Sequence, residues 1–304
     1  MATSTRFLQH SGRAKAMKRI IFELMALGLF LGVTGRAKAD YDFTTIDPPG
    51  AALSQARGIN ASDQIVGFYR ETTGGPNHGF LLSGDKYTMV EPPRSTSNVA
   101  QAINDLGEIV GSYVDEDGVR HGFLLSEDSY TTLDPPGSTD TLAFGINDLG
   151  EIVGAFYDAA GRRHGFLLSE GKYSMLDPPG SSKTLAGAIN DSGQIVGYYD
   201  DAGGTTHGFL LCEGKYATLR DVPGATLTAA WGINDSGEIV GWYDDAGSTT
   251  HGFLLSEDED KYTTLDVPDS TLSVNFKIND LGQIVGFYHD QDGRSHGFLG
   301  TPKK

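Results

Sequence analysis

Six histidines recur along this chain at steps of 43 to 45 residues, each followed by Gly-Phe-Leu. Imidazole is a common zinc ligand and a general acid or base near neutral pH. The spacing matches no local zinc motif, and one histidine per repeat cannot converge on a single ion unless that place lines an axis. We therefore predict no metal site, and we expect each imidazole to bond an aspartate or backbone group of its own repeat. The six are His78, His121, His164, His207, His251 and His296.

An acidic residue recurs in step with the histidines, four positions after a glycine. Two of its loops, residues 115–118 and 290–293, resemble calcium loops in their Asp-x-Asp-Gly order. A calcium loop needs about six oxygen ligands and usually a distal glutamate, which neither stretch has. Aspartate and glycine are also the residues that form turns, so we predict turns and no cofactor. The positions are Glu71, Asp115, Asp158, Asp201, Asp245 and Asp290.

Aromatic residues suggest two readings. Tyr69, Tyr113, Tyr199, Tyr243 and Tyr288, with Phe156, follow the same glycine by two positions, and we expect them to pack between repeats. The alternative is a platform for sugar rings. Trp231 and Trp242 are better candidates for such a platform, because they occupy positions whose residue changes from copy to copy. At the position of Trp231 the other copies have Arg57, Gln101, Phe144, Gly187 and Phe276.

These residues belong to six copies of one pattern, built on Asn-Asp-x-Gly-x-Ile-Val-Gly and His-Gly-Phe-Leu. The third copy predicts four short strands, at residues 141–147, 151–158, 164–168 and 173–177, separated by turn residues. A period of about 40 to 45 residues with four strands is typical of a propeller blade. Glycines recur inside the second strand and in each His-Gly-Phe, which indicates close approach of a neighbouring blade.

The order of the strands is rotated relative to the chain ends. The chain begins with a strand of the fourth type, residues 41–46, and ends on one of the third type, residues 296–299. The last copy lacks its own fourth strand, and the N-terminal strand can supply it, which removes exposed edges. We therefore predict an all-β, six-bladed propeller with four-stranded blades over residues 40–304, closed by pairing of the N-terminal strand with the last blade. An open solenoid would need distinct polar capping repeats at its two ends, and the sequence shows none.

The repeated Gly-Ile-Asn-Asp-x-Gly-x-Ile-Val-Gly-x-Tyr with His-Gly-Phe-Leu resembles the HAF repeats of secreted bacterial proteins, over about residues 41–299. The resemblance implies extracellular repeats without an assigned activity. The first copy departs from the pattern, with Ala61 in place of the turn aspartate and a longer second loop at residues 70–77.

Residues 1–39 have the order of a secretory signal peptide. A basic stretch ends at Arg19, an apolar run extends from Ile20 to Val33, and Ala37-Lys38-Ala39 is a small-x-small cleavage site. The run is too short to span a bilayer, which needs roughly 20 residues. Translation from Met17 is the alternative start. We predict a secreted or periplasmic protein, in which the single cysteine, Cys212, forms no intramolecular disulfide.

Residues 1–39 hold seven basic side chains and one acidic one, so the remainder has 16 basic against 39 acidic residues, a formal charge of −23. Such a surface repels nucleic acid and anionic membranes and favours cations or neutral ligands. No nucleophile motif, P-loop or dinucleotide fingerprint is present. We predict a monomeric, non-enzymatic binding module for a carbohydrate or a protein. The alternative is a polysaccharide hydrolase or lyase that uses acidic residues at the channel mouth.

Loops of a four-stranded meander alternate between the two faces of the ring. The Asn-Asp-x-Gly turns share one face and are nearly identical, so we read them as structural. The loops between the second and third strands share the other face and vary, and variable loops on a rigid scaffold often carry function. We therefore place the candidate contacts there, together with the two tryptophans. They are Asp115, Arg120, Asp158, Arg163, Asp201, Trp231, Trp242, Asp245, Asp290 and Arg294.

Overall fold

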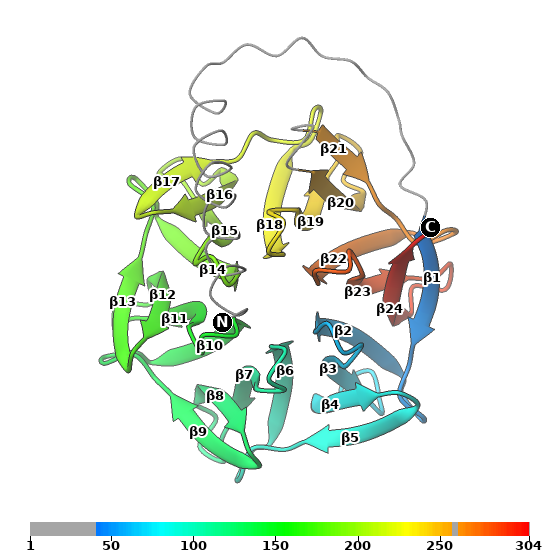
Figure 1. Ribbon diagram of the computed structural model, residues 1–304, viewed down its shortest axis with the longest axis horizontal. Coiled ribbons are helices and arrows are strands. Elements are labelled where there is room, and N and C mark those ends of the chain that lie inside the picture. The colour runs from blue at the N-terminus through cyan, green and yellow to red at the C-terminus, as the bar shows by residue number, and fades with distance from the viewer. Residues whose placement is uncertain (1–40, 257–260, 304) are drawn as a thin grey trace, which may run out of the picture. The chain divides into compact units, whose positions relative to one another are not determined.

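The computed structural model describes residues 41–256 and 261–303, which form six four-stranded antiparallel sheets around a central axis (Figure 1). The predicted all-β, six-bladed propeller is confirmed. The predicted signal peptide, residues 1–39, lies outside the described residues. In the described part of the chain, no helix has the length and apolar character needed to cross a membrane.

Each blade is a meander whose first strand lies innermost (Figure 1). Blade 1 comprises β2 (Leu53–Ile59), β3 (Ile65–Arg70), β4 (His78–Ser83) and β5 (Lys86–Val90). Blade 2 comprises β6 (Ser97–Ile103), β7 (Ile109–Val114), β8 (Arg120–Ser126) and β9 (Ser129–Leu133). Blade 3 comprises β10 (Asp140–Ile146), β11 (Ile152–Tyr157), β12 (Arg163–Ser169) and β13 (Lys172–Leu176). Blade 4 comprises β14 (Lys183–Ile189), β15 (Ile195–Asp200), β16 (Thr206–Cys212) and β17 (Lys215–Thr218). Blade 5 comprises β18 (Leu227–Ile233), β19 (Ile239–Asp244), β20 (Thr250–Ser256) and β21 (Lys261–Thr264).

Blade 6 closes the ring. It comprises β22 (Leu272–Ile278), β23 (Ile284–His289), β24 (Ser295–Pro302) and β1 (Tyr41–Ile46). The N-terminal β1 pairs antiparallel with β24 over six residues, as predicted. The Tyr41 hydroxyl also donates to the Gly282 carbonyl at 3.0 Å. The two ends of the described chain are therefore joined in one sheet, which leaves no open edge at the seam.

Every innermost strand carries one β-bulge at the same place, three residues before the turn asparagine. The unpaired residues are Arg57, Gln101, Phe144, Gly187, Trp231 and Phe276. A bulge re-aims its side chain, and here it aims them inward. The rings of Phe144 in blade 3 and Trp231 in blade 5 lie 5.5 Å apart although those blades are not neighbours, so this level of the strands lies at the axis.

The repeated glycines have two different causes. A Cβ on Gly67, in the second strand of blade 1, would lie 2.1 Å from the Gln55 carbonyl oxygen and 2.9 Å from the Phe80 ring, both in the same blade. The expectation that these mid-strand glycines face a neighbouring blade is therefore wrong. The expectation of a close neighbouring blade is correct for the glycine of His-Gly-Phe, since a Cβ on Gly79 would lie 2.3 Å from Oδ1 of Asn98 in blade 2.

The innermost strands all end at the Asn-Asp-x-Gly turns, which defines two faces of the ring. The turn face carries those turns and the short turns between third and fourth strands. The loop face carries the loops between second and third strands and the Pro-Pro-Gly connections. The central channel therefore has a turn-face mouth and a loop-face mouth.

Candidate functional site

In blades 2 to 6, the repeated histidine bonds aspartates of its own blade. Nδ1 of His164 lies 2.6 Å from Oδ2 of Asp177, and its Nε2 lies 3.3 Å from Oδ2 of Asp158. Oδ1 of Asp158 accepts the backbone N–H groups of Ala160 and Arg162 at 2.9 and 2.8 Å. A similar arrangement recurs for His121 with Asp134 and Asp115, His251 with Asp266 and Asp245, and His296 with Asp47 and Asp290. In blade 4, His207 bonds Asp201 at 3.4 Å, and Asp221 lies 4.0 Å away. The predicted histidine–aspartate bonding within each of these blades is confirmed.

Five of the predicted contact residues are engaged by these bonds. The backbone N–H donated to each carboxylate lowers its pKa, and the neighbouring histidine lowers it further; this applies to Asp115, Asp158, Asp201, Asp245 and Asp290. The periodic tyrosines pack against the repeated histidines, and Tyr288 stacks on His296 at 5.3 Å between ring centroids. These aspartates close their loops and orient the imidazoles. Within the described residues, no group of three or more His, Cys, Asp or Glu side chains is arranged to hold a metal ion.

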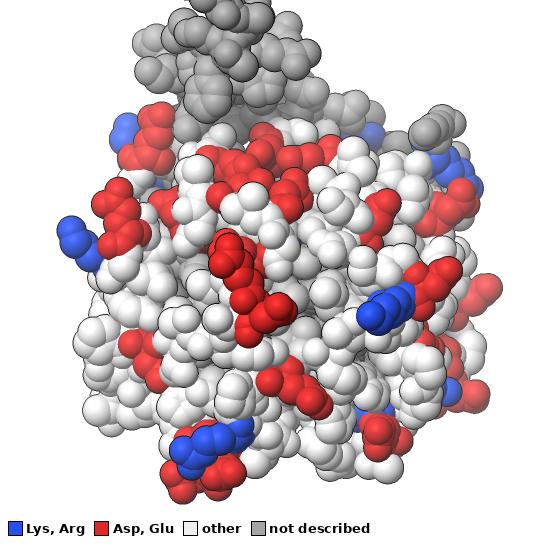
Figure 2. All heavy atoms as spheres, turned by 60° about the horizontal axis from the view of Figure 1, so that its bottom comes forward, with Lys and Arg blue, Asp and Glu red and all other residues white. Residues whose placement is uncertain are grey.

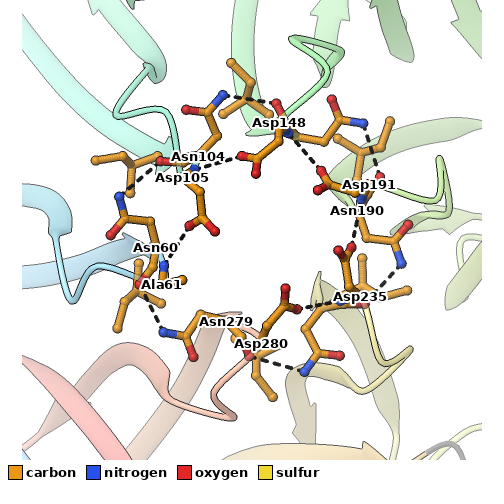
Figure 3. A pocket seen from close by; sticks show the side chains of 18 residues that line it. Asn60, Ala61, Asn104, Asp105, Asp148, Asn190, Asp191, Asp235, Asn279 and Asp280 are labelled. Atoms are coloured by element: carbon orange, nitrogen blue, oxygen red, sulfur yellow. Dashed lines mark hydrogen bonds between the residues drawn. The ribbon is translucent and has the colours of Figure 1, made fainter. Parts of the chain in front are cut away.

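The turn-face mouth is a ring of repeated hydrogen bonds (Figure 3). Nδ2 of Asn104 donates to Glu108 at 2.9 Å and to the Asn147 carbonyl of the next blade at 3.1 Å. Its Oδ1 accepts the Glu108 N–H at 2.9 Å. The chain of asparagines closes where Asn279 donates to the Asn60 carbonyl at 3.0 Å. Each asparagine both shapes its own turn and ties two blades together.

Beside the asparagines stands an aspartate ring, made of Asp105, Asp148, Asp191, Asp235 and Asp280, which lines the mouth (Figure 3). The backbone N–H of four of these aspartates donates to the carboxylate of the next blade, as that of Asp105 does to Asp148 at 2.8 Å. Ala61 occupies the sixth position and has no carboxylate to offer. Burial raises the pKa of Asp235 to about 6, and the negative charges of Asp280 and Asp191 add to the rise. We did not foresee this ring from the sequence, although five aspartates at one repeat position signalled it.

Below the turn-face mouth, an axial aromatic cluster from blades 3 to 6 extends from the bulge level toward the loop-face ends of the innermost strands. Trp231 lies at its centre, with ring centroids 5.8 Å from Tyr198 and 5.6 Å from Phe276. The half-buried members of the cluster are Leu142, Tyr198, Trp242, Leu272 and Phe287. The cluster consists of Leu142, Phe144, Ala155, Leu185, Tyr198, Trp231, Trp242, Leu272, Val274, Phe276 and Phe287. The structure thus brings both predicted tryptophans together.

The three predicted arginines have different surroundings. The guanidinium carbon of Arg163 lies 5.2 Å from the centroid of the Tyr198 ring, and its buried Nε has no hydrogen-bond partner. Arg120 lies 3.5 Å from Asp140, whose buried Oδ1 also lacks a partner. Arg294 lies elsewhere and donates to the carbonyls of Ala51 and Ala52, joining blade 6 to the start of blade 1. Of the predicted arginines, Arg163 is placed at the cluster and Arg294 serves the ring seam.

Charge elsewhere on the surface is mostly negative. On the face shown in Figure 2, acidic side chains predominate and basic ones occur singly, mostly beside an acidic one. Arg94 and Glu116 form an exposed ion pair of this kind, at 3.0 Å. This face offers no continuous basic patch for a phosphate backbone.

No family model and no curated protein matches this chain. Solved structures do match its fold. TolB from Acinetobacter baumannii has a TM-score of 0.57 at 14% identity, covering 78% of this chain and 63% of TolB, so the chain spans less than two thirds of that protein. The putative TolB from Agrobacterium tumefaciens has a TM-score of 0.56 at 14% identity, covering 83% and 91%. AofleA from Arthrobotrys oligospora has a TM-score of 0.54 at 12% identity, covering 88% of each chain. At these identities the likeness shows a shared propeller fold.

Proposed function

We propose that this protein is an exported, non-enzymatic binding module that takes a saccharide at the loop-face mouth of its channel. One observation carries the proposal: aromatic side chains are concentrated there on blades 3 to 6, in a ring whose other features repeat from blade to blade. Sugar rings stack on tryptophan and tyrosine faces, and both tryptophans of the chain belong to this cluster. We also propose membership of the HAF-repeat proteins and export by residues 1–39, on the motifs in the sequence.

Lectins among the similar folds add support of a general kind. The Aleuria aurantia lectin in complex with Fucalpha1-6GlcNAc matches with a TM-score of 0.51 at 13% identity, covering 83% of this chain and 93% of the lectin. The six-bladed fold of this lectin is thus a scaffold on which saccharide binding occurs.

The competing hydrolase or lyase reading depends on acidic residues at a channel mouth. The carboxylates of the aspartate ring occupy equivalent positions and each accepts a backbone N–H from the preceding blade, as Asp191 does from Asp148 at 2.8 Å. A glycosidase needs two carboxylates that face the substrate, one as acid and one as base or nucleophile. The use of these carboxylates in joining neighbouring turns favours binding over hydrolysis.

A glycan array combined with a degradation assay tests the proposal. We expect retained glycans and no released product. Substitution Trp242→Ala should weaken the best ligand by about tenfold, the loss of one aromatic stacking face with its buried area. Leu149→Ala is the matched control, because Leu149 is an exposed apolar residue of a turn-face turn. Release of shortened products, or equal affinity in the wild type and Trp242→Ala, would refute the proposal.

A further inference from the structure

Two basic side chains lie inside the channel. Arg57 is the bulge residue of β2, and its guanidinium carbon lies 4.0 Å from the centroid of Phe276 and 5.4 Å from that of Phe68. One Nη donates to the side chain of Gln55. The buried Nε has no partner, although the residue as a whole keeps partial exposure. Arg57 is therefore held in place with hydrogen-bonding capacity left over.

Lys277 follows the bulge of β22, at a position where the other blades carry only glycine or alanine. Its Nζ donates to the carbonyls of Gly187 at 2.6 Å and Trp231 at 3.3 Å, in blades 4 and 5. The side chain thus reaches the bulge level of two other blades. Carbonyl oxygens carry only partial charge, so they orient the ammonium group without neutralising it.

Neither cation has a carboxylate partner among the described residues, in a chain with 40 acidic side chains. Burial lowers the pKa of Arg57 to about 9. Burial, and then the charge of Arg57, lower the pKa of Lys277 to about 7. Buried charges are normally paired, because an unpaired charge loses its hydration. The interior of the channel therefore has the opposite electrostatic character to the acidic surface.

Both cations adjoin the axial aromatic cluster. Arg57 packs on Phe276, and Lys277 bonds the backbone of Trp231, which are two members of that cluster. The aspartate ring lies at the other mouth and repels an anion there, so an anion would enter from the loop face. A guanidinium beside an ammonium group suits a carboxylate, which accepts charge-assisted hydrogen bonds from both.

We propose that Arg57 and Lys277 bind the carboxylate of an acidic saccharide whose ring lies on the axial aromatic cluster. This inference rests on the proposed function and names its class of substrate. It replaces the expectation from overall charge, which favoured cations or neutral ligands, because the charge that a ligand meets is the local one.

Sodium glucuronate, glucose and sodium acetate are titrated separately into the protein. Binding is measured by calorimetry and by tryptophan emission. The variants are Arg57→Gln and Lys277→Ala, which introduce the residues that blade 2 carries at these positions, Gln101 and Ala102. Arg94→Gln is the control, because it removes a cation from an exposed ion pair. The titrations of the wild-type protein already compare glucuronate with glucose, so the result stands even if a variant does not fold.

We expect glucuronate to bind at least about tenfold more tightly than glucose, as one charge-assisted hydrogen bond supplies. Each channel variant should lose that advantage, and Arg94→Gln should keep it. Equal affinity for glucuronate and glucose would refute the proposed carboxylate site but would agree with saccharide binding. Binding of acetate that is lost in Arg57→Gln, with no sugar bound, would contradict the saccharide and the proposed function together. No binding of any of the three would overturn the proposed site.

Discussion

The two mouths of the channel are built on opposite plans. At the turn face, every blade contributes the same asparagine, and that side chain bonds its own turn and the next blade, as Asn147 does with Glu151 and Asn190. Inside the channel, three residues before those asparagines, the bulge positions hold arginine, glutamine, glycine and three aromatic residues. Two arginines on this side of the turn-face mouth, Arg57 and Arg163, each have a buried Nε without a partner.

The difference separates stability from recognition. Side chains whose hydrogen bonds are fulfilled within the protein rigidify it and have little left for a ligand. Side chains that differ between blades and retain unused donors have that capacity. Loss of the turn-face network should therefore reduce stability, whereas loss of loop-face side chains should reduce binding.

The largest effect should come from the closure that both mouths share. Deletion of residues 41–47 removes β1, exposes the edge of β24 and takes away the buried side chain of Ile46. Loss of six paired residues and their apolar surface should lower the melting temperature by roughly 10 °C or more. Calorimetry on a variant that begins at Asp40 provides the reference, and an unchanged melting temperature would refute closure by β1.

Asn147→Ala should have the next largest effect on stability. It removes two donated bonds, to Glu151 at 3.0 Å and to the Asn190 carbonyl at 3.2 Å, and leaves buried groups unsatisfied. We expect a loss of about 3 kcal/mol in the free energy of unfolding, measured in denaturant. Saccharide affinity should stay unchanged, because the loop-face cluster is untouched. A loss of affinity at constant stability would reverse the roles of the two mouths.

Asp235→Asn should stabilise the protein at neutral pH. The folded-state pKa of Asp235 is about 6 against an ordinary value of 3.8, so ionisation opposes folding as pH rises through this window. The amide keeps an oxygen for the Asp191 N–H, which Asp235 accepts at 2.9 Å. The melting temperature should rise at pH 7 and match wild type below about pH 4. Equal stability of the two proteins at every pH would show that neither burial nor neighbouring charge opposes the ionisation of Asp235.

Ala61→Asn should have a smaller, favourable effect. Ala61 is the one member of its repeat position without a side-chain acceptor, and asparagine there offers an oxygen to the Asp280 N–H without adding charge. We expect a gain of about 1 kcal/mol in the free energy of unfolding. Ala61→Asp should gain less at pH 7, because a sixth carboxylate joins five others. Equal gains for the two variants would contradict electrostatic repulsion in the ring.

The repeat was sufficient to predict the propeller, its six blades and its closure, because each strand type occurs six times and the chain ends carry complementary types. It also predicted the histidine–aspartate bonds, since both residues recur in phase. The cause of glycines such as Gly67 was misread, because the Phe80 ring that covers Gly67 belongs to the same blade. Lys277 escaped notice for another reason: only the bulge geometry shows that a side chain at this position reaches the axis.

Tryptophan emission during ligand titration tests the central claim most directly. The chain contains two tryptophans, Trp231 and Trp242, and both belong to the axial aromatic cluster, so their emission reports on that cluster. The account predicts that a saccharide found on the array changes this emission in proportion to the binding measured by calorimetry. Saturable binding by calorimetry with unchanged emission would place the ligand elsewhere and contradict the account.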